Sequence, residues 1–316
     1  MNAIFVSDLH GRRDRYAKLF DTIENERPEG VFLGGDLLPS GLMETGPRGT
    51  DTFVHEVIAA GFERLKVSLG DAYPAVFVIL GNDDGRAVEP ALLHYDEPGA
   101  RPLWHYVHGR SVAWGAYRVF GYAYIPPSPF ALKDWERYDV SRFVDPGCTS
   151  PESGYYSVEV PDRTKRTATI KGDLDELFGP AADAPLAQPG SETAVGSPEI
   201  GSPETGFPEA RLDNVIILFH APPYDTALDR AALDDTWVDH VPLDVHVGSI
   251  AIRRFIEARQ PRITLHGHIH EAPRLTGRWH EEIAATHALT AAHDRPGLAV
   301  VRFDPDDPAA AQRAIL

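Results

Sequence analysis

Acidic, amide and imidazole side chains follow directly after five apolar runs of the 316-residue chain. In chain order, these groups are Ser7-Asp8-Leu9-His10, Gly35-Asp36, Gly81-Asn82-Asp83-Asp84, His220 and His266-Gly267-His268-Ile269-His270. Carboxylate and amide oxygens mixed with imidazole nitrogens suit borderline divalent metals such as Mn, Fe, Co, Ni and Zn. Singly, each group has an ordinary explanation, such as an aspartate that caps a helix or a histidine satisfied in the core. In this order, and all after apolar runs, they indicate a metal site.

The number of candidate ligands bears on how many ions the site holds. Seven donors are too many for one ion that keeps an open position, and they suit two ions that share a bridging carboxylate. The candidate metal ligands are Asp8, His10, Asp36, Asn82, His220, His268 and His270. Of the remaining histidines, His266 suits either a supporting role or a strand position. The others show no ligand spacing: His94, His105, His108, His240, His246, His280, His287 and His293.

The elements that must position these ligands are strands that alternate with helices. The runs 3–6, 31–35 and 75–80 predict buried strands, and helical spacing over 16–23 and 51–69 predicts helices between them. This β-α-β-α-β opening implies neighbouring parallel strands with helices packed outside. Since open α/β sheets bind ligands at the carboxyl ends of their strands, we expect the polar groups to meet in one crevice.

The rest of the chain is less regular. Residues 103–124 are aromatic and β-branched with glycine punctuation, which favours short antiparallel strands. Further elements are expected as strands at 155–160, 214–219, 262–265 and 298–303, with helices near 170–177 and 248–259. Residues 179–208 are rich in Pro, Gly and Ser and poor in large apolar residues, so we expect a disordered insertion there. An acidic C-terminal tail is expected at 304–316.

Composition limits the classes of partner. The formal net charge is −17, which argues against nucleic acid and membrane surfaces as partners because both attract clustered Lys and Arg. Cys148 is the only cysteine, so an internal disulfide and a thiolate metal cluster are excluded. The chain shows neither a signal-peptide pattern nor a long apolar span, and we expect a soluble, cytoplasmic protein. Its oligomeric state is not legible.

The ordered motifs Asp8-x-His10, Gly35-Asp36, Gly81-Asn82, His220 and Gly267-His268-x-His270 resemble those of the calcineurin-like metallophosphoesterase superfamily, in particular a prokaryotic branch of small phosphoesterases. The resemblance implies an α/β fold of mixed α+β character, a four-layer α-β-β-α sandwich with two facing mixed sheets. It implies a single domain over residues 1–316. It also implies that Asp8, His10 and His270 bind a first metal, that Asp36 bridges, and that Asn82, His220 and His268 bind a second. Two divalent ions are expected, with Mn or Fe favoured over Zn, Ni and Co.

Asp83 departs from the family pattern, in which Gly-Asn is followed by a histidine that serves the leaving group. Metal charge nearby favours an ionised Asp83, which cannot donate a proton. Alternatively, Asp83 and Asp84 share a proton, or Asp83 only caps a turn or binds Arg86. Asp84 would orient the missing histidine in relatives. Arg86 is a candidate for holding phosphate oxygens. Asp83, Asp84 and Arg86 are therefore the candidate catalytic residues.

The predicted function is metal-dependent hydrolysis of a small phosphoester, with a diester favoured over a monoester. The resemblance implies attack on phosphorus by a hydroxide that bridges the two metals. Two alternatives stay open: a serine/threonine or other phosphomonoester phosphatase of the same fold, and a non-catalytic protein that binds a phospho-ligand or a partner. The retention of every metal ligand favours an enzyme.

Overall fold

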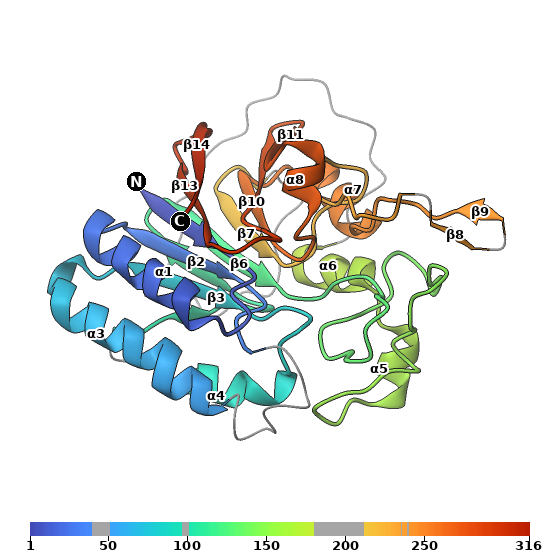
Figure 1. The fold of residues 1–316 in the computed structure, drawn as a ribbon, viewed down its shortest axis with the longest axis horizontal. Helices are drawn as coiled ribbons and strands as arrows, with labels where there is room; N and C mark the ends of the chain where they lie inside the picture. The colour runs from blue at the N-terminus through green and yellow to red at the C-terminus, as the bar shows by residue number, and fades with distance from the viewer. Residues whose placement is uncertain (40–50, 97–100, 180–211, 235, 239) are drawn as a thin grey trace.

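Two six-stranded sheets form the centre of the protein (Figure 1). The computed structural model describes residues 1–39, 51–96, 101–179, 212–234, 236–238 and 240–316. The first sheet has the order β14 (Asp307–Ile315), β13 (Ala299–Asp304), β1 (Ala3–Val6), β2 (Gly30–Gly34), β3 (Ala75–Ile79) and β4 (His105–Tyr106). The second has the order β11 (His280–Ile283), β12 (Thr286–Thr290), β10 (Ile263–His266), β7 (Val215–Phe219), β6 (Tyr117–Tyr122) and β5 (Ser111–Trp114).

Both sheets are mixed. Parallel pairs join β1, β2, β3 and β4 in the first sheet and β6, β7, β10 and β12 in the second. Antiparallel strands complete the edges: β13 and β14 on the first sheet, β5 and β11 on the second. A separate two-stranded hairpin consists of β8 (Trp237–Val238) and β9 (Val241–Pro242).

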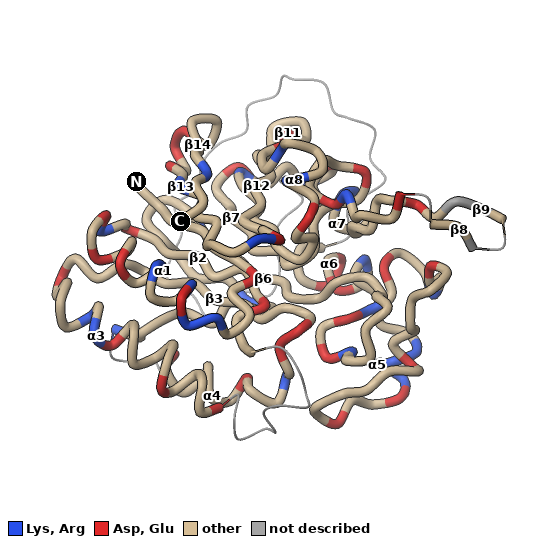
Figure 2. Tube along the Cα trace, in the orientation of Figure 1, with Lys and Arg blue, Asp and Glu red and all other residues tan. Residues whose placement is uncertain are grey.

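The inner faces of the two sheets enclose an apolar core. Phe5, Phe32 and Phe77 project from neighbouring strands of the first sheet, and the Phe32 and Phe77 rings stack with centroids 5.0 Å apart. Apolar side chains of β6, β7 and β10 meet them from the second sheet. In Figure 2 charged residues lie mainly on helices, loops and edges, and the central strands β1, β2, β3 and β7 contain none.

Helices cover the outer faces of the sheets. Over the first sheet lie α1 (Arg13–Glu26), η1 (Val54–Ala59), α3 (Ala60–Leu69), η3 (Arg86–Val88) and α4 (Glu89–His94). Over the second lie α6 (Ile170–Phe178) and α7 (Ile250–Arg259), where Phe178 and Phe255 pack together with ring centroids 4.8 Å apart. The described residues also form η2 (Gly70–Ala72), α5 (Asp162–Thr167) and α8 (Ala272–Thr276). These layers confirm the predicted α-β-β-α sandwich.

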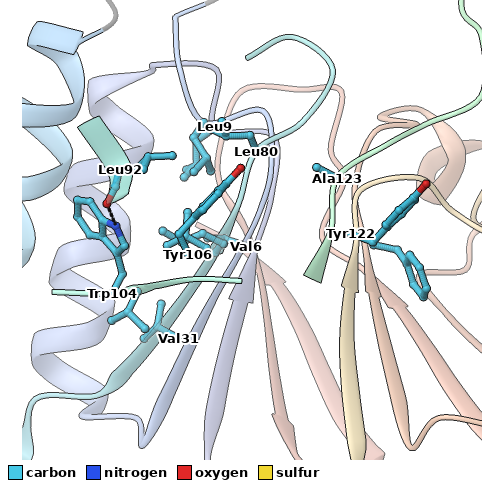
Figure 3. Close-up of a cluster of buried hydrophobic side chains, with 14 of the residues drawn as sticks. Val6, Leu9, Val31, Leu80, Leu92, Trp104, Tyr106, Tyr122 and Ala123 are labelled. Carbon is cyan, nitrogen blue, oxygen red and sulfur yellow. Dashed lines mark hydrogen bonds between the residues drawn. The ribbon is translucent and has the colours of Figure 1, made fainter. Parts of the chain in front are cut away.

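A large buried side chain outside the first sheet, Trp104, has a hydrogen-bond partner for its one polar atom. Figure 3 shows Trp104 between Leu92 of α4 and Val31 of β2. The indole Nε1 of Trp104 donates a hydrogen bond to the Leu92 carbonyl oxygen at 3.0 Å. Burying this indole therefore contributes apolar contact without an unpaired donor.

Helix ends follow from the sequence. In α1, Tyr16, Leu19, Phe20 and Ile23 form the buried face that their spacing predicts. The helix ends at Arg27, whose backbone is left-handed and whose N–H donates to the Ile23 carbonyl. The predicted helix near 248–259 is α7, which begins after Ser249; the Ser249 hydroxyl accepts the Ile252 N–H at 3.0 Å.

Two predicted features are wrong. Residues 304–316 do not form an acidic tail, because Pro305 and Asp306 make a tight turn and β14 pairs antiparallel with β13. The predicted strand at 155–160 is absent, since among these residues only Tyr155 bridges to another segment, at Leu132. Within 103–124, β5 and β6 form the expected antiparallel pair, but β4 joins the other sheet in parallel. The predicted insertion at 179–208 lies outside the described residues from 180 onward.

Candidate metal centre

The polar groups after β1, β2, β3, β7 and β10 meet at the carboxyl ends of these strands, as predicted. Four of the predicted ligands hold a left-handed backbone: Asp8 (φ 57°), His10 (φ 45°), Asp36 (φ 52°) and His268 (φ 71°). This conformation is unfavourable for residues other than glycine, and such strain gathers at functional sites. Backbone bonds fix the turns, with the Asp8 N–H donating to the Gly35 carbonyl at 3.0 Å and the His10 N–H to the Asp36 carbonyl at 2.8 Å.

One cluster consists of Asp8, His10, Asp36 and His270, whose potential ligand atoms all lie within 4.8 Å of one another. The Nε2 atoms of His10 and His270 are 3.1 Å apart. His270 Nε2 lies 3.3 Å from Asp8 Oδ1 and His10 Nε2 lies 3.8 Å from Asp36 Oδ2. The buried Asp8 carboxylate also accepts the Ser7 hydroxyl at 2.5 Å and the His268 backbone N–H at 3.0 Å.

A second cluster shares Asp36 with the first and adds His220 and His268, again within 4.8 Å. His220 Nε2 lies 3.3 Å from Asp36 Oδ2 and 3.0 Å from Asn82 Oδ1. The seven predicted ligands therefore form two adjoining groups with the Asp36 carboxylate between them. Asp36, Asn82 and His220 are buried.

The glycines of these motifs allow the close approach. A Cβ on Gly81 would lie 2.3 Å from Asp36 Oδ1 and 2.6 Å from His220 Cε1. A Cβ on Gly35, where φ is +94°, would lie 2.6 Å from His220 Nδ1. Both positions need glycine because any side chain would displace the ligands.

Two imidazoles are oriented by acceptors outside the clusters. His220 Nδ1 donates to the Gly34 carbonyl oxygen at 2.8 Å, and His10 Nδ1 donates to Asp83 Oδ2 at 3.1 Å. Each bond leaves Nε2 facing the shared carboxylate. Metal-binding histidines are commonly fixed in this way by a carboxylate or carbonyl on the other ring nitrogen.

Charge in the clusters is balanced by protons on imidazole. Burial lowers the pKa of His220, but Asp36 and Asp8 outweigh it and raise that pKa to about 9. Burial also lowers the pKa of His10, but the nearby carboxylates of Asp83, Asp36 and Asp8 outweigh burial and raise that pKa to about 9. Burial and the proximity of His220 lower the pKa of His268 to about 3. Despite burial, His220 and His10 hold the pKa of Asp36 at about 2.

These pKa values predict that metal binding releases protons. Because the pKa values of His10 and His220 are raised to about 9, both imidazoles are protonated at neutral pH and must lose a proton to bind a cation. The affinity for each ion should therefore rise about tenfold per pH unit between about pH 6 and pH 8, and level off near pH 9. Titration calorimetry with Mn²⁺ at several pH values measures this slope. A pH-independent affinity would contradict the assignment of these two ligands.

Asp83 lies at the edge of the clusters, and its side chain is 37% exposed. Its carboxylate accepts the His10 Nδ1–H, and its backbone N–H donates to Asp36 Oδ1 at 2.8 Å. The two other partners predicted for Asp83, Asp84 and Arg86, are bound by different groups. Asp84 is fully buried and accepts the backbone N–H groups of Leu37, Leu38 and Gly81 at 2.8–3.1 Å.

Asp84 thus ties the loop after β2 to the loop after β3. Burial and the nearby Asp36 raise the pKa of Asp84 to about 7, against the effect of the three backbone donors. Arg86 contacts neither cluster. Its Nε donates to Glu89 Oε2 at 2.9 Å and its Nη1 to the Tyr124 hydroxyl at 3.2 Å. Asp84 is therefore held by backbone hydrogen bonds between two loops, and Arg86 belongs to a separate network.

Sequence reasoning left some residues without a role. Ser7, next to Asp8 in the sequence, carries no ligand signal, yet its hydroxyl donates to the Asp8 carboxylate and orients it. His266 Nδ1 donates to the Ala221 carbonyl oxygen at 2.8 Å, which makes it a support for the loop after His220. A third group of possible ligands, His280, Glu282 and His287, lies on β11 and β12. Its signal was a histidine and a glutamate two residues apart on a strand.

Comparisons with known proteins identify similar sequences and similar folds. The family model of calcineurin-like phosphoesterases matches residues 1–272. An uncharacterized protein of Methanocaldococcus jannaschii is 41% identical over 63 residues, a match that spans 19% of this chain and only 25% of that protein. A crystal structure from Thermus thermophilus matches with a TM-score of 0.51 at 15% identity and covers 99% of this chain and 98% of its own. A further solved structure with the same identity and coverage reaches a TM-score of 0.54.

The two structural matches show the fold, and the family match adds the chemistry. Members of this family hydrolyse phosphoesters with divalent metal ions, and the two clusters offer this chain candidate ligands for such ions. In the described part of the chain, no helix has the length and apolar character needed to cross a membrane. The matched family model extends over most of the chain, including every predicted metal ligand. The chain belongs to the calcineurin-like phosphoesterase family.

Proposed function

We propose that the protein is a phosphoesterase that uses two divalent metal ions and favours small phosphodiesters over phosphomonoesters. The observation that carries this proposal is the shared carboxylate: Asp36 belongs to both ligand clusters. Asp8, His10 and His270 would complete the first site, and Asn82, His220 and His268 the second. Mn or Fe is favoured because each site mixes carboxylate or amide oxygen with imidazole.

The residues fit two cations in chemistry and charge. The pKa values of His10 and His220 are raised to about 9 beside the buried Asp8 and Asp36 carboxylates, so both clusters favour positive charge. The two orienting bonds to Asp83 and Gly34 use Nδ1, which leaves Nε2 of each histidine for a metal. When bound, the ions would activate water for attack and neutralise the oxygens on phosphorus.

The chain's own residues supply position and charge. Asp36 would hold both sites at a fixed separation. Asp84 fixes the loops that carry Asp36 and Asn82 through its three backbone donors. Asp83 orients His10 and places a carboxylate at the exposed edge of the clusters. With its charge there, the site disfavours a dianionic monoester more than a monoanionic diester, because repulsion from a negative side chain grows with the negative charge on the substrate.

Turnover of matched substrates tests the proposal. With the protein loaded separately with Mn, Fe, Zn, Ni and Co, an aryl phosphodiester should turn over on the order of tenfold faster than the matching aryl monoester. A faster monoester would instead support a phosphomonoester phosphatase of this fold. Bound metal without turnover of either ester would support a non-catalytic member. The test uses small esters because the net charge of −17 disfavours nucleic acid.

A further inference from the structure

The third group of possible ligands lies on one face of the β11–β12 hairpin. In the antiparallel register Glu282 is opposite His287, and His280 is opposite Leu289. Paired residues share a face, so His280, Glu282 and His287 project on the same side as Leu289. Leu289 belongs to the core between the sheets. The three side chains therefore lie at the edge of the second sheet, on the edge strand β11 and its neighbour β12.

The potential ligand atoms converge. His280 Nε2 and His287 Nδ1 are 2.9 Å apart, and His287 Nδ1 lies 3.9 Å from Glu282 Oε1. One ligand atom from each of the three residues lies within 4.8 Å of both others. The histidines are partly buried, while the Glu282 side chain is 64% exposed and can adjust its rotamer.

This group is distinct from the centre around Asp36. His287 is level with Ile263 at the start of β10, whereas His268 and His270 follow the end of that strand at His266. Three strand residues span roughly 10 Å. The hairpin group thus lies toward the opposite end of the second sheet from the Asp36 clusters.

We propose that His280, Glu282 and His287 form a separate site for one borderline divalent metal ion such as Zn²⁺. Two imidazoles and one carboxylate are a common ligand set for zinc, with water completing the coordination. Tetrahedral zinc at about 2.0–2.1 Å from each nitrogen needs the two nitrogens roughly 3.3 Å apart, so a few tenths of an ångström of movement suffices. The ion would fasten the edge strand β11 to β12.

The protonation of the pair is compatible with binding. Burial and the proximity of His287 lower the pKa of His280. Burial also lowers the pKa of His287, against the effect of Glu282. Both imidazoles are therefore neutral at neutral pH. Metal binding needs only the small movement and a shift of the proton between the two rings to the other nitrogen of its imidazole. His10 and His220 differ in this respect, because their raised pKa values mean that each must lose a proton before it can bind a metal.

The experiment is equilibrium dialysis against Zn²⁺ followed by elemental analysis. His287→Ala should hold one zinc fewer per chain than the wild type, and Glu282→Gln should weaken that ion at least about tenfold. Neither variant should change phosphodiester turnover. His94→Ala, a histidine on α4 outside the three groups, serves as the matched control and should keep the wild-type zinc content.

The same comparison in an Asp36→Ala background separates this site from the proposed two-metal centre. The one-zinc difference between Asp36→Ala and the Asp36→Ala, His287→Ala double variant should persist whether or not the centre around Asp36 is correctly assigned. Equal zinc content in the wild type and Glu282→Gln at all concentrations, or an equal loss in His94→Ala, would overturn the proposal. Glu282→Gln alters an exposed side chain, so this readout does not depend on a variant that disturbs the core.

Discussion

An Asp36→Ala protein is expected to lose at least one metal ion and nearly all phosphoesterase activity. Asp36 is the residue shared by both ligand clusters, so its loss removes a ligand from each. It also removes the counter-charge that holds the His220 pKa near 9 and the acceptor for the Asp83 N–H. Removing a single donor that stabilises a developing oxyanion already costs about 10²–10³-fold in rate. We therefore expect a fall of at least about 10³-fold, with metal content measured by elemental analysis.

Asp36→Asn separates charge from shape. The amide keeps an oxygen for the Asp83 N–H, so the loop after β3 should stay in place while bridging between two cations is lost. Asp139→Asn is a matched control, because Asp139 is a part-buried aspartate that instead accepts the Ile250 N–H at 2.7 Å at the start of α7. Wild-type metal content in Asp36→Ala would contradict the shared-ligand assignment.

The sandwich of two facing sheets was expected from the family resemblance. The central strands could be predicted from the residues themselves, because they are buried on both faces and read as continuous apolar runs. β1, β2, β3 and β7 have that character. The edges could not be predicted in the same way. β14 has mixed composition with several exposed residues, and it is a strand because its backbone pairs with β13 after the turn at Pro305 and Asp306. Pairing of this kind is a tertiary contact that composition does not record.

The site was more predictable than its surroundings because each ligand follows the end of a buried strand. What the sequence could not supply is which partner each side chain takes. Arg86 was a candidate for phosphate binding on the strength of its position, but Glu89 three residues later and Tyr124 from a distant segment hold its guanidinium. Likewise His280 and His287 are seven residues apart in the sequence, and they meet because the hairpin register makes them diagonal neighbours on one face of the sheet.

We expect that Asp83 does not protonate the leaving group. Its carboxylate accepts the His10 Nδ1–H at 3.1 Å, and an ionised acceptor of that kind cannot also protonate a leaving group. The leaving group should then depart largely unaided. Turnover should depend steeply on leaving-group pKa, and aryl phosphodiesters should be favoured over alkyl phosphomonoesters. The slope of log kcat/KM against leaving-group pKa measures this dependence.

Two substitutions distinguish orientation from proton transfer. Asp83→Asn keeps an oxygen that can accept the His10 Nδ1–H, so metal affinity and the leaving-group slope should change little. Asp83→His puts the residue typical of the family at this position. It should raise monoester turnover and flatten the slope, because a placed general acid is typically worth about 10²–10⁴-fold. Because histidine is a poorer acceptor for His10 than a carboxylate, Asp83→His should also weaken metal binding, which dialysis against Mn²⁺ measures independently of rate.

The pattern of losses decides between the two roles. If Asp83 only orients His10, Asp83→Asn acts equally on good and poor leaving groups, because any small change in metal affinity affects every substrate alike. Suppose instead that Asp83→Asn abolishes turnover of poor leaving groups and spares good ones at saturating metal. Asp83 would then be the proton donor, and its bond to His10 would describe the metal-free protein but not the working enzyme. A full metal complement in that variant is the necessary control, since lost metal would mimic a general loss of rate.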